Sequence, residues 1–551
     1  MNDKQFFERN ISALSLTQPS LACSLSKAKT ALTHYEFKES SSGEIIPAWI
    51  DPGHPARPLH STVDPRREAK RLMDTLGNEG FIVLLGLGGG FFAEAALERE
   101  QTARVLVIDF CIDSIAELLC HKDYSEILCD PRFHILIDPD ETAIEQYILS
   151  AYQPALCEGI RMLPLRARTA ADNENFGKAA EAVEKAVQKV SADYSVQAYF
   201  GARWFSNSLR NLISAEKENC ALPLIKHAAV TAAGPSLNLQ IPLLKKRRKT
   251  VFLIATDTSL PCLLAEDISP DAVVSIDCQH ISYYHFMSGL PKETLLFMDL
   301  AGPPLVASLS KNIRFFSGSH PLTNYIKTCY SLPDVDTSGG NVTYASVSLA
   351  EKLGAESIEL YGADFSYPMG LCYARGAYVH PYFEIRQKRL APLEAQYSAF
   401  LYRGLLTKKL TNTSWYYESH SLTFYREKLE AHCEASGIDL IPQDGLGSPI
   451  QVFPKKINSN ARQTPPFTAS KARMKAEDFL ADYSSKIRSL PVFVKNYTEF
   501  LKSLETDERL VFFTILPTAA ALKRRDPALS VKELIEKTKS HCIARIEKVL
   551  N

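Results

Sequence analysis

The chain has 551 residues, with 62 Lys and Arg against 63 Asp and Glu, 46% hydrophobic residues and 23% charged residues. These proportions are those of a folded protein of roughly three or four domains, and they exclude a chain that is disordered, collagenous or coiled-coil throughout. The nearly neutral charge balance also argues against a protein that holds nucleic acid by neutralising phosphates.

The sequence contains no candidate for a targeting or membrane segment. Its first residues are polar, and the most apolar window, residues 81–97, is interrupted by four glycines and by Glu94. Because a membrane-spanning helix needs about 20 predominantly apolar residues, we expect a cytoplasmic protein without a membrane span.

A glycine-rich turn marks the N-terminal region. An apolar run that begins at Phe81 ends in Gly86-x-Gly88-x-Gly90, a helical stretch follows, and a second apolar run ends at Asp109. This order predicts a β-α-β unit. The spacing suits a dinucleotide or S-adenosylmethionine site, in which the acid holds ribose hydroxyls. The alternative is that the glycines only permit a tight turn with close packing.

A second α/β region extends from about residue 222 to residue 450, after a helical stretch at 171–220 that is predicted to link two domains. Its predicted strands are short apolar runs at residues 227–231, 250–255, 272–276, 294–298, 313–316, 357–361 and 438–441. Because helix signals lie between several of these runs, the predicted assembly is a doubly wound, mostly parallel sheet.

The predicted fold class is therefore α/β with a helical end. We predict an N-terminal α/β Rossmann-like domain at 1–200 and a central doubly wound domain at 205–455, where we place the chemistry. A loop is predicted at 458–467, and a helical C-terminal domain at 465–551.

The first polar loop of the central domain directly follows the run at 227–231. It contains Gly234, Pro235 and Ser236. Glycine allows close backbone approach, proline is tolerated at a helix start, and Ser236 can cap the helix. A helix N-terminus in this place would be an anion site.

Two further polar loops are predicted at the ends of strands in the same domain. Thr337, Ser338 and Gly339 precede a helix predicted at 342–353, and the run at 357–361 leads into Gly362 and Asp364. Because the carboxyl ends of parallel strands meet at one edge of a sheet, the three loops are expected to converge on one crevice.

Several short motifs occur in a fixed order along this region, namely Gly234-Pro-Ser-Leu, Ile254-Ala-Thr-Asp257, Pro270–Asp277, Gly339-Gly-Asn-Val, Leu349–Gly354, Leu360–Asp364 and Tyr373-Ala374. As an ordered set they resemble the Maf (motility accessory factor) flagellin glycosyltransferases, whose central domain is also similar to archaeal 6-hydroxymethylpterin diphosphokinases. The resemblance covers about 222–450, and the Gly86 loop with Asp109 resembles the Maf N-terminal domain.

The central domain of that family is in turn similar to bacterial sialyltransferases that use CMP-activated sugars. This resemblance implies a donor site at Gly234, Pro235 and Ser236, with nucleotide contacts at Thr337, Ser338 and Gly339 and a further contribution from Gly362 and Asp364. It implies that Tyr367 and Tyr373 hydrogen-bond the departing phosphate and that His420 is the general base. His380 is the competing base, because it follows Tyr373 closely in the chain.

Two aspartates depart from the sialyltransferase pattern. Asp257 and Asp277 stand where those enzymes carry Asn. A carboxylate repels a phosphate unless it is protonated, turned towards a ribose hydroxyl or bridged by a cation. We assign both aspartates to the donor site and predict no bound metal and no cofactor besides the CMP-activated sugar, although the pair leaves a bridging cation open.

The resemblance implies a glycosyltransferase that moves a nonulosonic acid of the pseudaminic or legionaminic type from its CMP donor to Ser or Thr of flagellin, a step needed for flagellar assembly and motility. Two alternatives stay open. One is a pterin diphosphokinase in which Asp257 and Asp277 hold Mg²⁺ with ATP, and the other is a non-catalytic flagellin-binding factor.

Overall fold

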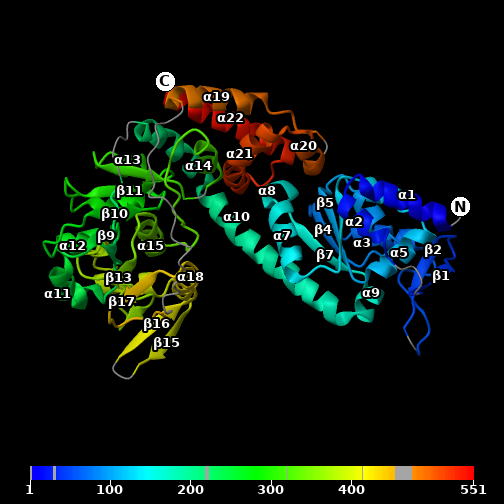
Figure 1. The fold of residues 1–551 in the computed structure, drawn as a ribbon, viewed down its shortest axis with the longest axis horizontal. Coiled ribbons are helices and arrows are strands. Elements are labelled where there is room, and N and C mark those ends of the chain that lie inside the picture. The colour runs from blue at the N-terminus through cyan, green and yellow to red at the C-terminus, as the bar shows by residue number, and fades with distance from the viewer. Residues whose placement is uncertain are drawn as a thin grey trace. The chain divides into compact units, whose positions relative to one another are not determined.

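A computed structural model of the chain describes residues 3–28, 33–51, 53–216, 222–318, 320–411, 414–452, 474–494 and 496–551 (Figure 1). The loop predicted at 458–467 lies outside these residues, as do residues 217–220 at the end of the predicted helical link.

The chain forms two compact units. The first comprises Met1–Ala202, Lys486–Phe512 and Leu516–His541, and the second comprises Arg203–Ser485, Phe513–Ile515 and Cys542–Asn551. The division of the sequence into three domains stays a prediction. The predicted link is helical, since α10 runs without a break over Asn173–Ala215.

A four-stranded parallel sheet forms the centre of the first unit, in the order β6-β5-β4-β7. Its strands are β4 (Phe81–Leu85), β5 (Arg104–Asp109), β6 (Phe133–Ile137) and β7 (Ile160–Pro164). The predicted β-α-β unit is confirmed as β4, α4 (Phe91–Leu97) and β5.

Further helices and a small antiparallel sheet from the N-terminal part of the chain belong to this unit. The helices are α1 (Asp3–Ser15), α2 (Pro19–Leu25), α3 (Pro65–Met73), α5 (Ile112–His121), α6 (Ser125–Cys129), α7 (Glu141–Ala151), α8 (Pro154–Cys157) and α9 (Arg166–Ala171). The sheet has the order β1-β2-β3, with β1 at Tyr35–Glu39, β2 at Ile45–Trp49 and β3 at Arg57–Pro58.

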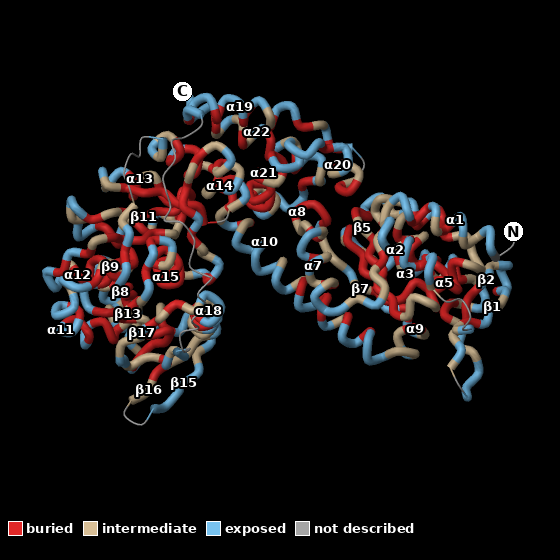
Figure 2. The backbone as a smooth tube through the Cα atoms, in the orientation of Figure 1, coloured by how far each residue is buried: buried red, intermediate tan, exposed pale blue. Residues whose placement is uncertain are grey.

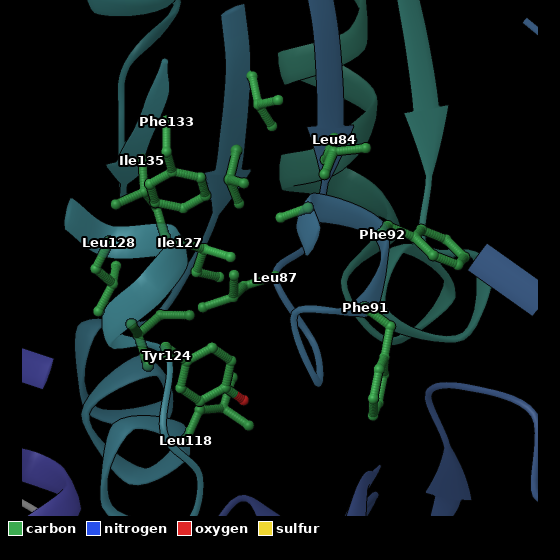
Figure 3. Packing of buried hydrophobic residues seen from close by; sticks show 14 of the residues in the cluster. Leu84, Leu87, Phe91, Phe92, Leu118, Tyr124, Ile127, Leu128, Phe133 and Ile135 are labelled. Atoms are coloured by element: carbon green, nitrogen blue, oxygen red, sulfur yellow. The ribbon is translucent and has the colours of Figure 1, made fainter. Parts of the chain in front are cut away.

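The glycine turn after β4 is filled by side chains of the same unit. The Gly89 N–H donates to His60 Nε2 over 2.9 Å, and the Tyr124 hydroxyl donates to the Gly88 carbonyl over 2.9 Å. A side chain at Gly88 would collide with the His60 ring. Figure 3 shows Leu87, Tyr124 and Ile127 packed together beside this turn.

Asp109 is fully buried and engaged within the chain. Its carboxylate accepts the Leu87 and Phe110 N–H groups, each over 2.8 Å, and pairs with Arg168 over 2.9 Å. Burial raises the pKa of Asp109, and the Arg168 guanidinium opposes that rise. The structure therefore favours the close-packed turn over a ribose-binding acid.

The second unit is built on a seven-stranded parallel sheet with the order β12-β11-β10-β9-β8-β13-β17. The strands are β8 (His227–Thr231), β9 (Phe252–Thr256), β10 (Ala272–Ser275), β11 (Leu295–Asp299), β12 (Ile313–Phe316), β13 (Ser357–Tyr361) and β17 (Asp439–Pro442). All seven predicted strands and the predicted fold class are confirmed. Their continuous apolar runs are typical of strands with both faces covered, and Figure 2 shows the strands largely buried.

The order of the strands sets where a crevice can form. The chain enters the sheet at β8, proceeds outward through β9 to β12, and returns to the other side of β8 with β13 and β17. The strand order therefore reverses beside β8, and such a switch point opens a crevice at the carboxyl ends of the strands.

The remaining elements of the chain are mostly helical. They are α11 (Leu237–Arg247), α12 (Leu260–Leu264), a 3₁₀ helix at His280–Phe286, α13 (Pro304–Ala307), α14 (Pro321–Ile326), α15 (Val342–Lys352), α16 (Val379–Arg386), α17 (Leu393–Leu401), α18 (His420–Ser436), α19 (Ala476–Ser489), α20 (Tyr497–Ser503), α21 (Thr506–Arg525) and α22 (Val531–Leu550). A small antiparallel sheet has the order β14-β16-β15, from Tyr367–Pro368, Trp415–Ser419 and Leu406–Leu410. In the described part of the chain, every helix is too short or too polar to cross a bilayer.

We expect Asp109→Ala to lower the free energy of unfolding of the first unit by about 3–5 kcal/mol, because Arg168 would become a buried charge without its carboxylate. Denaturant titration read by hydrogen exchange in β4 and β5 measures this change. Asp74→Asn, at the exposed end of α3, is the control and should stay within about 0.5 kcal/mol of wild type. Equal unfolding midpoints for the two variants would contradict the role given to the Asp109–Arg168 pair.

Candidate functional site

A pocket of about 250 Å³ opens where β8 and β13 end. Five residues selected from the sequence line it, namely Gly234, Gly362, Asp364, Tyr367 and Tyr373. The sequence analysis missed several other residues of the lining that carry polar groups, namely Thr258, Asn341, Thr343, Ser366, Arg403 and Tyr425. The pocket lies at the switch point of the sheet, where α/β proteins bind ligands.

Two glycines allow the loops after β8 and β13 to touch. The Gly234 N–H donates to the Gly362 carbonyl over 2.8 Å. A Cβ at Gly234 would overlap Asp364 and that carbonyl, and a Cβ at Gly362 would overlap the Ala232 carbonyl. Gly362 also has φ +64°, a conformation that favours glycine. The pocket floor is therefore mainly backbone.

A buried carboxylate joins these loops. Asp364 accepts the Ser236 backbone N–H over 2.8 Å and also accepts the Ser236 hydroxyl. Ser236 is the N-cap residue of α11, but its hydroxyl makes no capping bond. The expectation that this serine caps the helix is therefore wrong, because Asp364 takes the hydroxyl instead.

The loop after β17 is tied to the same point. The Gly447 N–H bonds to Asp364, and the Leu446 N–H donates to the Ser236 hydroxyl oxygen over 2.7 Å. Burial raises the pKa of Asp364, while these donors lower it. We call Asp364, Ser236 and the donors at 446 and 447 the Asp364 latch. The latch holds three loops in register beneath the pocket.

Two phenols and one guanidinium form the polar wall of the pocket. Tyr367, in β14, is buried and Tyr373 is half-buried. Burial raises the pKa of both phenols, and the positive charge of Arg403 opposes the rise. Arg403 follows α17, and its guanidinium lies 4.3 Å from the centre of the Phe400 ring. The pocket thus holds two protonated donors beside a cation.

The loop before α15 lies next to the pocket. Asn341 lines the pocket and caps α15, since its side chain accepts the Tyr344 N–H over 3.0 Å. The predicted nucleotide contacts Thr337, Ser338 and Gly339 precede it and are not part of the pocket lining. The Thr337 hydroxyl donates to the Gly318 carbonyl over 3.0 Å, while Ser338 is exposed. Their role in donor binding stays a prediction.

Asp257 and Asp277 lie close enough to influence each other. Asp257 is buried and accepts the Thr258 N–H and the Ser275 hydroxyl, each over 2.7 Å. Burial raises the pKa of Asp277, and the charge of Asp257 adds to the rise. Thr258, the residue after Asp257, lines the pocket, whereas Asp257 and Asp277 themselves are not part of the lining. Within the described residues, no group of three or more His, Cys, Asp or Glu side chains is placed to hold a metal ion.

The two candidate bases, His420 and His380, differ in their exposure and in the hydrogen bonds that their rings make. His420 is exposed at the first position of α18, and Leu422 in the same turn lines the pocket. His380 Nε2 lies 3.1 Å from the Ala374 carbonyl, and its Nδ1 bonds to the Tyr397 hydroxyl. Since a carbonyl only accepts, Nε2 carries the proton and Nδ1 accepts from the phenol. This arrangement disfavours His380 as a base.

Comparison with known proteins places the central region in a family. Residues 204–370 match the family model described as 6-hydroxymethylpterin diphosphokinase MptE-like. An uncharacterized protein of Treponema pallidum (strain Nichols) is 32% identical over 164 residues, which make up 29% of this chain and 78% of that protein. The chain belongs to the same family as this protein.

Two other uncharacterized proteins of the same organism match shorter shares of their own length. One is 33% identical over 150 residues, 26% of this chain and 54% of that protein. The other is 29% identical over 181 residues, 31% of each. The chain therefore spans about half of the first and about a third of the second.

One solved structure resembles the chain over its whole length. It is a Maf glycosyltransferase from Magnetospirillum magneticum AMB-1, with a TM-score of 0.58 and 14% identity, and the match covers 100% of this chain and 91% of that chain. The chain thus shares the fold of a Maf glycosyltransferase, and the resemblance that the ordered motifs indicate is confirmed at the level of the fold.

We expect Asp364→Ala to speed amide hydrogen exchange at 234–236 and 446–448 by about tenfold or more, because the donors of the latch lose a buried charged acceptor worth about 1.5–3 kcal/mol. Asp364→Asn, which keeps one acceptor oxygen, should lie between the alanine variant and wild type. Exchange mass spectrometry measures both. Unchanged exchange in these segments would show that the loops hold their positions without the latch.

Proposed function

We propose that the chain is a glycosyltransferase that transfers a nonulosonic acid from a CMP-activated donor to Ser or Thr of flagellin. The observation that carries the proposal is that Gly234, Tyr367, Tyr373 and Arg403 line one pocket at the switch point, in a chain with the fold of a Maf glycosyltransferase. The pseudaminic or legionaminic type of sugar and the flagellin acceptor rest on the motif resemblance, as does the absence of a cofactor beyond the donor.

The donor phosphate would lie against Tyr367, Tyr373 and Arg403, because the N–H groups of Gly234 and Gly362 already donate to the Gly362 carbonyl and to Gln240. In the reaction, the bond between the anomeric carbon and the phosphate oxygen breaks, and negative charge develops on the CMP that leaves. The phenols of Tyr367 and Tyr373 and the guanidinium of Arg403 would bind that charge. A preorganised donor of this kind stabilises the transition state more than the ground state.

The acceptor hydroxyl forms the new bond to the anomeric carbon and loses its proton. His420 is the proposed base, because its ring is exposed at the start of α18 while Leu422 and Tyr425 of that helix line the pocket. An imidazole within reach of the acceptor hydroxyl can take its proton as a general base. The same exposure leaves room for a protein acceptor at the pocket mouth.

We expect Tyr367→Phe, Tyr373→Phe and Arg403→Gln each to lower kcat for sugar transfer by about 10²- to 10³-fold, because each removes one donor to the leaving phosphate. Intact-mass analysis of flagellin incubated with the CMP-sugar measures the rate. Tyr402→Phe and Lys409→Gln are matched controls, since both side chains are exposed and lie outside the pocket lining.

The pH dependence provides a further readout of the phenols. Burial raises the pKa of Tyr367 and Tyr373, so both stay protonated beyond the ordinary value of about 10. Alkaline loss of activity should therefore begin only above about pH 10. If the pocket variants behaved like the two controls, the proposed role of this wall would be wrong. If the wild-type chain bound flagellin without adding any sugar mass to it, a non-catalytic flagellin-binding function would take the place of this proposal.

We expect His420→Ala to lower kcat by about 10²- to 10⁴-fold, because the general base is lost. His380→Ala serves as the comparison and should reduce activity mainly through stability, since it loses the bonds to Ala374 and Tyr397. Wild-type kcat in His420→Ala, together with a large loss of kcat in a still folded His380→Ala variant, would reverse the assignment.

A second candidate function is a pterin diphosphokinase. The match of residues 204–370 to the MptE-like model favours it, and so does the proximity of Asp257 and Asp277. Two carboxylates together with nucleotide phosphates and water can complete the oxygen shell of Mg²⁺. Incubation with ATP, Mg²⁺ and hydroxymethyldihydropterin tests it, with Asp277→Asn as the variant. Pterin turnover without any mass increase on flagellin would replace the first proposal with this one.

A further inference from the structure

A second pocket, of about 790 Å³, lies in the first unit and is unrelated to the crevice described above. Its walls come from the segment after β3, from α3 and from the turn after β7. The first sheet has its own switch point, because the chain runs from β4 through β5 to β6 and then returns to β7 on the other side of β4. The residues that directly follow β7, Leu165 and Arg166, line this pocket. A pocket in this position, with this volume, has the properties of a small-molecule site.

Three arginines give the pocket its charge. Arg67 and Arg71 stand one turn apart on α3, and Arg166 begins α9. Within the described residues, the structure gives none of the three guanidinium groups an ion pair or hydrogen bond. The adjacent Arg66, in contrast, pairs with Glu94 over 2.9 Å.

The two acidic side chains of the pocket lining already accept hydrogen bonds from backbone N–H groups. The Asp64 carboxylate caps α3 by accepting the Arg67 N–H over 2.9 Å, and Glu68 accepts the Ser61 N–H over 2.9 Å. The pocket lining therefore contains two acidic side chains and three arginines, and its net charge is positive. Guanidinium groups bind phosphates and carboxylates in a two-point manner.

A buried histidine in the wall of this pocket is a second, independent indication that the pocket binds a ligand. The His60 side chain is fully buried, and its Nε2 accepts the Gly89 N–H. Burial lowers the pKa of His60, so the neutral ring carries its proton on Nδ1. That Nδ1 lies 3.8 Å from Glu68 Oε2, farther than a direct hydrogen bond, and Glu68 opposes the lowering of the His60 pKa. Buried polar atoms without a partner are rare and call for an explanation such as a bound group.

We propose that this pocket binds the oxyanion of a small organic molecule, a phosphate or a sugar carboxylate, through Arg67, Arg71 and Arg166. The apolar body of the ligand would lie against Leu72 and Phe92, which line the same pocket. The glycine turn after β4 would then contribute to this site by holding His60 in the wall of the pocket. Its own backbone would not contact the ligand.

Hydrogen-exchange mass spectrometry on the full chain tests the proposal, with inorganic phosphate, CMP and N-acetylneuraminate as separate probes at constant ionic strength. We expect at least one probe to protect residues 58–72 and 164–167 saturably. Arg71→Gln and Arg166→Gln should each raise the half-saturation concentration about tenfold, which corresponds to about 1.4 kcal/mol. Lys70→Gln, an exposed charge on α3 outside the pocket lining, should match wild type.

The probes distinguish the source of the anion. Protection by phosphate and CMP alone indicates a phosphorylated ligand, and protection by N-acetylneuraminate alone indicates a sugar acid. The proposal is overturned if no probe protects these segments, or if Lys70→Gln weakens protection as much as Arg71→Gln does. Protection that CMP gives in the second unit alone reports the crevice, and it overturns the proposal only if phosphate and N-acetylneuraminate also leave residues 58–72 and 164–167 unprotected.

Discussion

The arrangement of the crevice depends on one buried carboxylate. Asp364 is 5% exposed, and its oxygens are met by the Ser236 N–H and hydroxyl and by the Gly447 N–H. Burying a carboxylate is costly unless hydrogen bonds replace its water, and here donors from two other loops do so. Because the loops after β8, β13 and β17 share this acceptor, they cannot separate without exposing it. The pocket above them is therefore shaped before any ligand arrives.

This construction is one way in which a nearly neutral chain could bind the anionic donor that we propose. With 62 basic and 63 acidic residues there is no general positive field to attract a phosphate. The crevice instead offers two phenols and the guanidinium of Arg403, all in a small pocket. Such fixed donors act over hydrogen-bond distances and lose little to screening by salt. The pocket of the first unit uses three arginines for a similar end, which suggests two anion sites of different construction.

The strands and the loop residues that follow them could be predicted from the sequence, whereas the contacts between side chains could not. The seven strands could be predicted because each is a continuous apolar run, and Gly234, Gly362 and Asp364 followed because they stand directly after such runs. The partner of Ser236 could not be predicted, because Asp364 is 128 residues away and the local pattern indicates a helix cap. Arg403 could not be selected from the sequence either, because it follows α17 and belongs to no recognisable motif.

A crystal structure of the chain soaked with saturating CMP tests the role of the crevice. We expect the phosphate to lie in the crevice, within hydrogen-bond distance of Tyr373 or Arg403, with the Asp364 latch unchanged. CMP bound only elsewhere, or a crevice that stays empty at saturating CMP, would show that the crevice is not the donor site.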